Sequence, residues 1–179
     1  MDDKILLFFG SIREYKGLDV LLHALSAVVQ KDPNVHLIIA GKCWSDFEQY
    51  QTIIDQNALG SNIHLFNDYI PSSLIADFFS AADLVVLPYT QFSSQSGVGA
   101  LAVAFNKPML VSRAGGLADY VNDTDCVYVQ EGDLPKKILN LINDKPALER
   151  LADDTKIIAK KYSWESVAQE TVKLYNSVS

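Results

Sequence analysis

Cysteine, histidine and positive charge are scarce in this sequence. Its two cysteines, Cys43 and Cys126, and its three histidines show neither the spacing of metal ligands nor that of a redox pair. We therefore expect reduced cysteines and a cytoplasmic protein with no metal or organic cofactor. Fifteen lysine and arginine residues against 22 aspartate and glutamate residues leave a formal net charge of −7, which argues against a surface for nucleic acid.

Long apolar runs are missing as well. No stretch approaches the roughly 20 apolar residues needed to span a bilayer, and the first residues lack the layout of a signal peptide, so we expect a soluble protein without a transmembrane segment. Apolar residues nevertheless make up 49% of the chain. With 179 residues it fits the usual domain size of roughly 100–200 residues, and we expect a single domain over residues 1–179.

Short apolar runs alternate along the chain with segments whose apolar residues recur at helical spacing. This alternation predicts an α/β fold with a doubly wound, mostly parallel sheet of about six strands and helices on both faces. Ligands of such sheets bind where the strands end, so the loops after the strands carry the candidate site. The expected strands are Ile5–Phe9, Val35–Ala40, Asn62–Phe66, Asp83–Leu87, Pro108–Val111 and Cys126–Val129.

Helices are expected between and after these strands. They are Lys16–Gln30, Asp46–Leu59, Ser72–Ala82, Val98–Phe105, Gly116–Asn122, Leu134–Asn143, Pro146–Lys161 and Trp164–Ser177. The last helix carries an apolar stripe, which we expect to be docked on a core. The stripe consists of Trp164, Val167, Ala168, Thr171, Leu174 and Tyr175.

The loop after the first strand has the layout of a phosphate site. Gly10 lets the backbone turn sharply at the end of the strand. Arg13 and Lys16 lie near the start of the next helix, where unpaired N–H groups and the helix dipole favour an anion. Two cations there would suit a diphosphate; the alternative is that both are solvated loop charges.

A second candidate anion site precedes the helix expected at Val98–Phe105. Small residues near its start leave backbone N–H groups accessible, although an ordinary serine N-cap explains them equally well. These residues are Ser94, Gln95, Ser96 and Gly97. Residues 97–102 also match the G-x-G-x-x-A dinucleotide pattern, but a long loop precedes them and no acidic residue ends the next strand, so we reject nicotinamide chemistry.

Taken together, these motifs resemble the C-terminal, donor-binding half of a GT-B glycosyltransferase of the large retaining family 4, or group 1. The order of the motifs carries the resemblance, which covers essentially the whole chain. The matching segments are Phe9–Gly17, Asn67–Pro71, Ala81–Pro88, Ala104–Pro108, Ala114–Leu117 and Tyr162–Trp164. The resemblance implies a Rossmann-like domain that forms one half of a GT-B fold.

The resemblance also implies roles for the two loops. A nucleotide-sugar donor, linked to UDP, GDP or ADP, would bind there through its diphosphate. The implied diphosphate-binding residues are Gly10, Arg13 and Lys16, with backbone N–H groups from Ser96, Gly97 and Val98. Fixed cations and dipoles of this kind stabilise a departing nucleoside diphosphate without a metal.

Aromatic residues near two other strand ends are implied in contacts with the base and ribose. Tyr69 and Ile70 would lie against the base, with Trp44 as a further stacking partner. For Tyr69, a half-buried aromatic in a turn is an equal alternative. The donor loop itself would contain Ser93, Ser94 and Gln95.

The sequence departs from the family pattern at the donor loop. Family members carry two glutamates, eight residues apart, that contact the sugar and the ribose, whereas Ser93 and Leu101 stand at those positions here. Ser11 replaces the usual arginine after the first glycine, so Arg13 must reach in from two residues later. The Gln-Ser-Gly-Val sequence at 95–98 resembles branches of the family without the glutamate. The sugar contacts and the catalytic residue therefore stay open.

A GT-B enzyme needs two Rossmann-like domains, and the resemblance covers only the second. We expect the N-terminal acceptor domain to be absent, and the chain to bind nucleotide without transferring sugar. Any peripheral contact with the inner membrane face would come from the missing half. The whole enzyme would transfer a hexose, with retention, to a saccharide or lipid-linked acceptor in surface polysaccharide or glycolipid synthesis.

Two other interpretations remain open at this point. One is a catalytically degenerate glycosyltransferase-like module that binds a nucleotide or a protein, which the missing glutamates favour. The other is an unrelated flavodoxin-like regulatory domain, which explains the alternation of strands and helices but not the order of the motifs.

Overall fold

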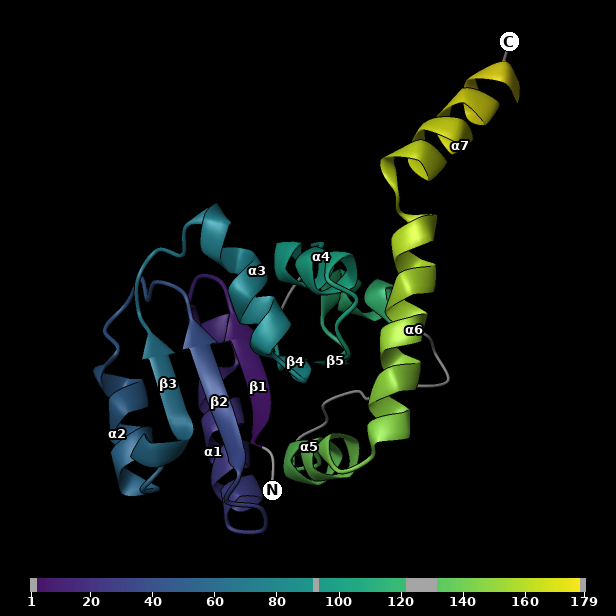
Figure 1. Cartoon of the computed structure of the whole chain (residues 1–179). Coiled ribbons are helices and arrows are strands. Elements are labelled where there is room, and N and C mark those ends of the chain that lie inside the picture. The colour runs from purple at the N-terminus through teal and green to yellow at the C-terminus, as the bar shows by residue number, and fades with distance from the viewer. Residues whose placement is uncertain (1–2, 92–93, 122–131, 178–179) are drawn as a thin grey trace.

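A parallel β-sheet forms the centre of the molecule (Figure 1). The structure is a computed structural model that describes residues 3–91, 94–121 and 132–177. The strands within these ranges follow the order β3-β2-β1-β4-β5, and each pairs in parallel with its neighbours. They are β1 (Lys4–Phe9), β2 (Val35–Ala40), β3 (Ile63–Phe66), β4 (Leu84–Leu87) and β5 (Met109–Val111). The predicted α/β, Rossmann-like architecture is confirmed, and the sixth expected strand, Cys126–Val129, lies outside the described residues.

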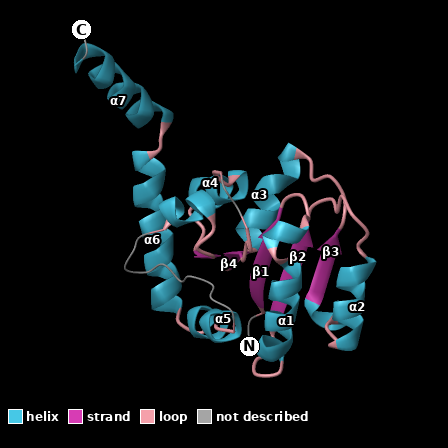
Figure 2. Ribbon diagram, turned by 180° about the vertical axis from the view of Figure 1, so that it is seen from behind, coloured by secondary structure: helices cyan, strands magenta, loops and turns pink. Residues whose placement is uncertain are grey.

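Helices cover both faces of this sheet. Figure 2 shows α1 and α2 in front of the sheet, on the face that points away from the viewer in Figure 1, whereas α3 lies on the other face. The helices are α1 (Leu18–Val29), α2 (Glu48–Gln56), α3 (Ser72–Ala81), α4 (Gly97–Ala104), α5 (Leu134–Ile142), α6 (Lys145–Lys161) and α7 (Trp164–Ser177). Short 3-10 turns occupy Glu14–Lys16, Gly60–Asn62 and Gly115–Tyr120.

Strand β1 supplies side chains to two separate cores. Leu6 and Phe8 pack with residues of α1, α2 and α5 on one face of the sheet. Leu7 and Phe9 pack with residues of α3, α4 and α6 on the other. Successive side chains of a strand point to opposite faces, so a strand buried on both faces must be apolar throughout. The unbroken apolar run in the sequence follows from this arrangement.

The start of α1 differs from the prediction in a way that matters for the site. The helix was expected to begin at Lys16, but it begins at Leu18, and Lys16 lies in the preceding 3-10 turn. Gly17 separates the two with φ of +69°, and a Cβ there would lie 2.1 Å from the Pro88 carbonyl oxygen. The left-handed backbone at this position interrupts the helix, because only glycine adopts it without strain.

Two further helices are shorter or tighter than expected. The helix predicted over Asp46–Leu59 covers only α2, because the Asp46 carboxylate accepts a hydrogen bond from Glu48 N at 2.9 Å and Ala58 adopts φ of +52°. The helix predicted over Gly116–Asn122 is the 3-10 turn Gly115–Tyr120, and Asn122 lies outside the described residues.

The expectation that the last helix docks on a core is wrong. None of the residues of α7 is buried, and Trp164 is 90% exposed. Ser163 caps the new helix by accepting a hydrogen bond from Ser166 N at 3.1 Å, and α7 leaves the end of α6 and projects away from the body (Figure 1). Periodicity reveals an apolar face, but the connection between two helices decides where that face points.

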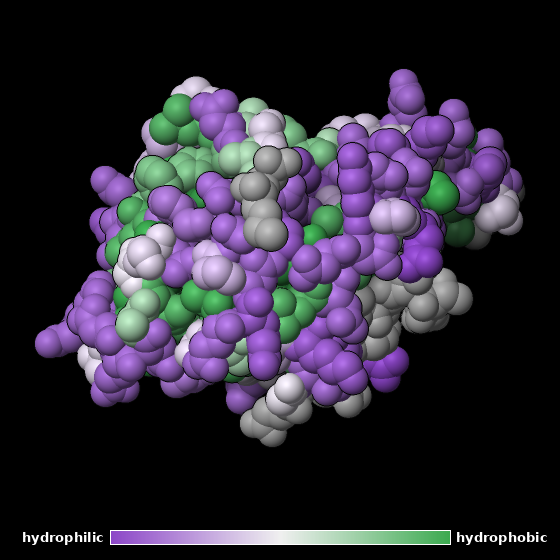
Figure 3. Space-filling view, turned by 60° about the horizontal axis from the view of Figure 1, so that its bottom comes forward, coloured by the Kyte–Doolittle hydropathy of each residue, from purple (hydrophilic) through white to green (hydrophobic). Residues whose placement is uncertain are grey.

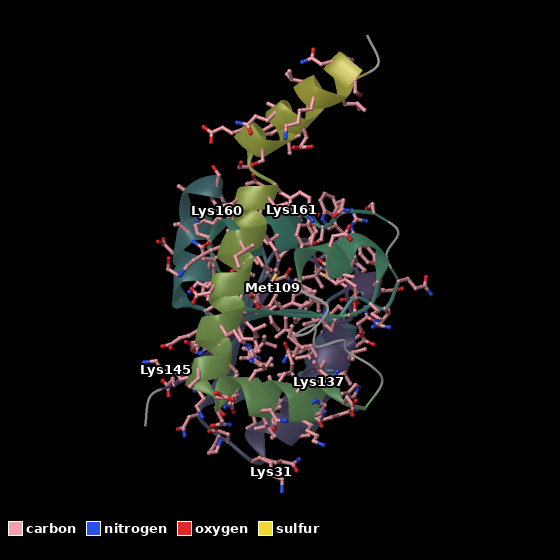
Figure 4. The ribbon with its side chains drawn as sticks, turned by 90° about the vertical axis from the view of Figure 1, so that its right-hand side faces the viewer. Lys31, Met109, Lys137, Lys145, Lys160 and Lys161 are labelled. Carbon is pink, nitrogen blue, oxygen red and sulfur yellow. The ribbon has the colours of Figure 1, made fainter. Side chains whose placement is uncertain are left out.

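The face drawn in Figure 3 is mostly hydrophilic, with smaller apolar areas between the polar side chains. Several lysines lie at the periphery, among them Lys145, Lys160 and Lys161 of α6, whereas Met109 of β5 lies in the interior (Figure 4). Within the described ranges, no helix combines the length and the apolar character that crossing a membrane requires.

Candidate functional site

A cavity of about 530 Å³ opens where β1 and β4 end. In the sheet, β2 lies on one side of β1 and β4 lies on the other. The cavity therefore lies at the point where the strand order reverses. Doubly wound sheets bind their ligands at such a point. The lining comes from the end of β1 with the following turn, from Tyr89 after β4, and from residues 94–96 with the first turns of α4.

Lys16 is the buried cation of this cavity, with only 7% of its surface exposed. Its Nζ lies close to Gly10, where an added Cβ would be 3.2 Å away, and 5.7 Å from the centre of the Tyr89 ring. Among the described residues, no carboxylate forms an ion pair with it. Burial and the nearby charge of Arg13 lower the pKa of Lys16 to about 8. A buried cation without an anionic partner is costly, so the site favours an anionic ligand.

Gly10 brings the two halves of the cavity together. Its φ is +87°, and its N–H donates to the Ala40 carbonyl oxygen at 2.8 Å. A Cβ at this position would lie 3.0 Å from Val98 Cγ2. Because a side chain would push against both Val98 and Lys16, glycine is what allows the β1 loop to approach the start of α4 so closely.

The N-terminus of α4 forms the opposite wall. Ser96 is its N-cap, and its Oγ accepts a hydrogen bond from Gly99 N at 3.2 Å. The expected serine cap is therefore present. It occupies the Gly99 N–H and leaves Gly97 and Val98 in the first turn, where backbone N–H groups have no intrahelical partner. These groups lie across the cavity lining from Lys16, and the helix dipole adds partial positive charge there.

Tyr89 contacts Ser96, the N-cap residue of this wall. Its ring is buried, and its hydroxyl lies 3.3 Å from Ser96 Oγ. Burial raises the pKa of Tyr89 to about 12, so the hydroxyl stays neutral and can share a hydrogen bond with the capping serine. Tyr89 is a site residue that the sequence motifs did not predict, and its available signal was an aromatic residue directly after the β4 strand and Pro88.

The structure gathers most, but not all, of the predicted site residues around the cavity. Those that line it are Gly10, Lys16, Ser94, Gln95, Ser96, Gly97 and Val98, together with Leu101. Ser93 lies outside the described residues. Leu101 presents an apolar side chain where the family pattern has a glutamate.

Arg13 and Trp44 line a neighbouring cavity of about 390 Å³ and not the cavity that Lys16 lines. The Arg13 guanidinium is 5.7 Å from the centre of the Trp44 ring, and Lys42 Nζ lies at the same distance from it. Tyr15 lines both cavities. The two predicted cations therefore do not share one cavity, because the 3-10 turn Glu14–Lys16 directs Lys16 inward and leaves Arg13, its N-cap, exposed.

Tyr69 and Ile70 are not among the residues that line either cavity. Tyr69 is 75% exposed, more than the half-buried alternative assumed, and Ile70 packs against the core on the α3 side. Across the described parts of the chain, no group of three or more histidine, cysteine, aspartate or glutamate residues is arranged to hold a metal ion.

Comparison with known proteins decides the family. The family model of glycosyl transferases group 1 matches residues 1–169. The chain belongs to the group 1 glycosyltransferases. It is 31% identical to the uncharacterized glycosyltransferase MJ1178 of Methanocaldococcus jannaschii, over 97% of this chain and 48% of the relative. An unrelated regulatory domain is thereby excluded, and the chain of this glycosyltransferase spans about half the length of the curated relatives it matches.

Solved structures agree with the fold. HepE of Anabaena, in complex with UDP and glucose, superposes with a TM-score of 0.82 at 20% identity, over 98% of this chain and 49% of HepE. A C-terminal domain of a group 1 glycosyl transferase, LpcC of Francisella tularensis, superposes with a TM-score of 0.74 at 20% identity, over 90% of this chain and 86% of that domain. At these identities the likeness shows the fold alone, a Rossmann-like fold that matches GT-B glycosyltransferases.

Proposed function

We propose that this domain is the C-terminal, donor-binding half of a retaining glycosyltransferase of family 4, and that it binds a nucleoside-diphosphate sugar in the cavity between β1 and α4. The observation that carries the proposal is Lys16, a buried cation without a described ion-pair partner that faces the N-terminus of α4 across Gly10. Cation and helix N-terminus converge on one space, and a diphosphate satisfies both.

The same groups account for catalysis of donor cleavage. As the bond from the sugar to the diphosphate breaks, negative charge grows on the departing nucleoside diphosphate. Lys16 and the N–H groups of Gly97 and Val98 are held in place before the reaction. They stabilise the transition state, in which this charge develops, more than they stabilise the bound substrate. Arg13 lines the neighbouring cavity and adds its positive charge from there. Gly10 forms the turn that follows β1. No metal ion is needed in this scheme.

The rest of the enzyme lies outside this domain in our proposal. The chain spans about half of its relatives, and its fold matches the C-terminal domain of LpcC over most of both chains. The N-terminal half would bind the saccharide or lipid-linked acceptor and make any contact with the inner membrane face, with the enzyme in the cytoplasm. The base would lie near Tyr69, Ile70 and Trp44 once both halves close over the donor.

Titration of UDP, GDP and ADP into the chain by calorimetry tests the proposal. We expect saturable binding of one of the three nucleotides, because base contacts select among donors that share the same diphosphate. HepE was crystallised with UDP, which puts UDP first in the series. Failure of all three nucleotides to bind would contradict the proposal. If one binds, addition of the N-terminal half and an acceptor separates an active transferase from a degenerate module, because only the former releases the nucleotide during sugar transfer.

Binding should weaken in alkaline solution. Lys16 is mostly protonated at pH 7, about one unit below its pKa of about 8, and a diphosphate is already mostly ionised at pH 7 because its last pKa is about 6. From pH 7 to pH 9 we therefore expect the affinity for the nucleoside diphosphate to fall about tenfold, as the protonated fraction of the free lysine falls. The measurement is the dissociation constant at half-unit steps of pH.

A Lys16→Arg variant is the control for this pH dependence. The guanidinium stays charged throughout the range, so its affinity, whatever its absolute value, should be flat between pH 7 and pH 9. A wild-type profile equally flat over that range would show that the charge of Lys16 does not contribute to binding.

A further inference from the structure

The loop before α4 is tied to the distant 3-10 turn Gly115–Tyr120. Gly116 N donates to the Ser94 carbonyl oxygen at 3.3 Å, and Gln95 Nε2 donates to Asp119 Oδ2 at 2.9 Å. The Tyr120 ring lies so close to α4 that a Cβ on Gly99 would be 2.7 Å from it. These contacts fix the wall of the cavity that carries the first turn of α4.

The contact with Asp119 sets the orientation of the Gln95 amide. A carboxylate can only accept hydrogen bonds, so the amide nitrogen must face it, and Gln95 Oε1 is left as an acceptor. Gly116 makes room for this arrangement, because a Cβ there would lie 2.5 Å from Nε2 and 2.8 Å from Oε1. Gln95 lines the same cavity as Lys16, whereas Asp119 stands behind it and does not line the cavity.

The described lining of this cavity is rich in donors, and besides the Gln95 amide its side-chain acceptors are the hydroxyls of Ser11, Ser94, Ser96, Tyr15 and Tyr89. Lys16 and the N–H groups at the start of α4 suit an anion, but a sugar is a neutral group whose hydroxyls also need acceptors. The Ser96 hydroxyl is already engaged with Gly99 N and Tyr89, and Leu101 is apolar. No carboxylate belongs to the described lining. The oriented Gln95 amide is thus well suited to accept a hydrogen bond from a hydroxyl beside a diphosphate.

We propose that Gln95, held in place by Asp119, accepts a hydrogen bond from a hydroxyl of the donor sugar, which makes Gln95 a determinant of sugar recognition and Asp119 its positioning residue. The inference rests on the proposed function and deepens it. It assigns the side chain through which the domain distinguishes a nucleotide sugar from the free nucleoside diphosphate.

The test compares two ligands on the same chain. The dissociation constants of UDP and UDP-glucose are measured by calorimetry, or those of GDP and GDP-mannose or ADP and ADP-glucose if another base binds. Gln95→Ala should lower the affinity for the nucleotide sugar about 5- to 10-fold, the value of one hydrogen bond, and change that for the nucleoside diphosphate less than about twofold. Asp119→Ala should act in the same direction with a smaller effect.

Gln51→Ala is the matched control. Gln51 Nε2 donates to Asp55 Oδ1 at 2.8 Å on the exposed face of α2, so the control removes the same kind of amide–carboxylate bond away from the cavity. It should alter neither dissociation constant.

A double variant that exchanges the amide and the carboxylate of Gln95 and Asp119 tests whether the preference for the nucleotide sugar can be restored. Gln95→Glu alone sets two carboxylates against each other and should lose the preference for the nucleotide sugar. In the double variant Gln95→Glu/Asp119→Asn the new amide donates to the new carboxylate, whose second oxygen still accepts, so the preference should return. A purely structural role of this bond would change the affinities for both ligands together and leave the preference for the nucleotide sugar unaltered.

Two results would overturn the inference while leaving the proposed function intact. One is an equal loss of affinity for both ligands in Gln95→Ala, which would assign Gln95 to the presentation of backbone N–H groups. The other is no change for either ligand. Absence of any nucleoside diphosphate binding by the unaltered chain is a different result, and it overturns the proposed function together with the inference.

Discussion

Replacement of Lys16 by alanine should lower the affinity of the domain for its nucleoside diphosphate about 30- to 100-fold. A hydrogen bond to a charged group contributes about 1.5–3 kcal/mol, and a factor of ten corresponds to about 1.4 kcal/mol. Lys16 lies at the upper end of this range because it is buried, so solvent screens its charge little. Calorimetric titration of the nucleotide that binds the unaltered chain measures the effect.

The variant should fold normally, since alanine removes a buried charge that costs desolvation energy and has no described ion-pair partner. Circular dichroism and urea unfolding check this. Lys42→Ala is the matched control: Lys42 is an exposed cation over Trp44 that does not line the cavity, and its removal should change the affinity about threefold at most. Wild-type affinity in Lys16→Ala would refute the assignment of the diphosphate to this cavity.

Replacement of Gly17 by alanine should lower the free energy of unfolding by about 2–4 kcal/mol. The left-handed backbone, with φ of +69°, costs a residue with a Cβ roughly 1–2 kcal/mol. The Cβ would also lie 2.1 Å from the Pro88 carbonyl oxygen, so the backbone on one or both sides must move, and strain of that kind accounts for the rest. Urea unfolding followed by circular dichroism gives the value.

The same change should weaken nucleotide binding. Gly17 follows Lys16 directly, and the added Cβ would push against Pro88, the residue before Tyr89. Gly60→Ala serves as the comparison: a Cβ at Gly60 would meet no atom within 4 Å, and the effect on unfolding should stay within about 0.5 kcal/mol. Equal stability of the two variants would mean that the contact between Gly17 and Pro88 relaxes without cost.

The fold was predictable because its signals are local. The apolar run at β1 and the helical spacing in α1 each follow from burial of the segment that carries them, and the repetition of such pairs predicts a parallel sheet. Boundaries were less predictable: the left-handed conformations of Gly17 and Ala58 ended a turn and a helix that periodicity alone extended. The orientation of α7 was not predictable, since an apolar stripe does not identify the surface that would cover it.

The candidate site was predictable in part. Gly10, Lys16 and the start of α4 were singled out separately, because glycine turns and helix N-termini have recognisable sequences. Their convergence depends on the neighbouring positions of β1 and β4 in the sheet. Arg13 was paired with Lys16 because the two are close in sequence, yet the 3-10 turn points them into different cavities.

Sequence by itself determined the doubly wound α/β class, the loops that line the candidate site, and the resemblance to group 1 glycosyltransferases, because each depends on residues close together in the chain. Only the tertiary structure decided which cation is buried, that Tyr89 supports the Ser96 cap, and that Asp119 orients Gln95 from 24 residues away. Burial and hydrogen-bond partnership are properties of atoms brought together by strand order and backbone conformation, and spacing along the chain does not contain them.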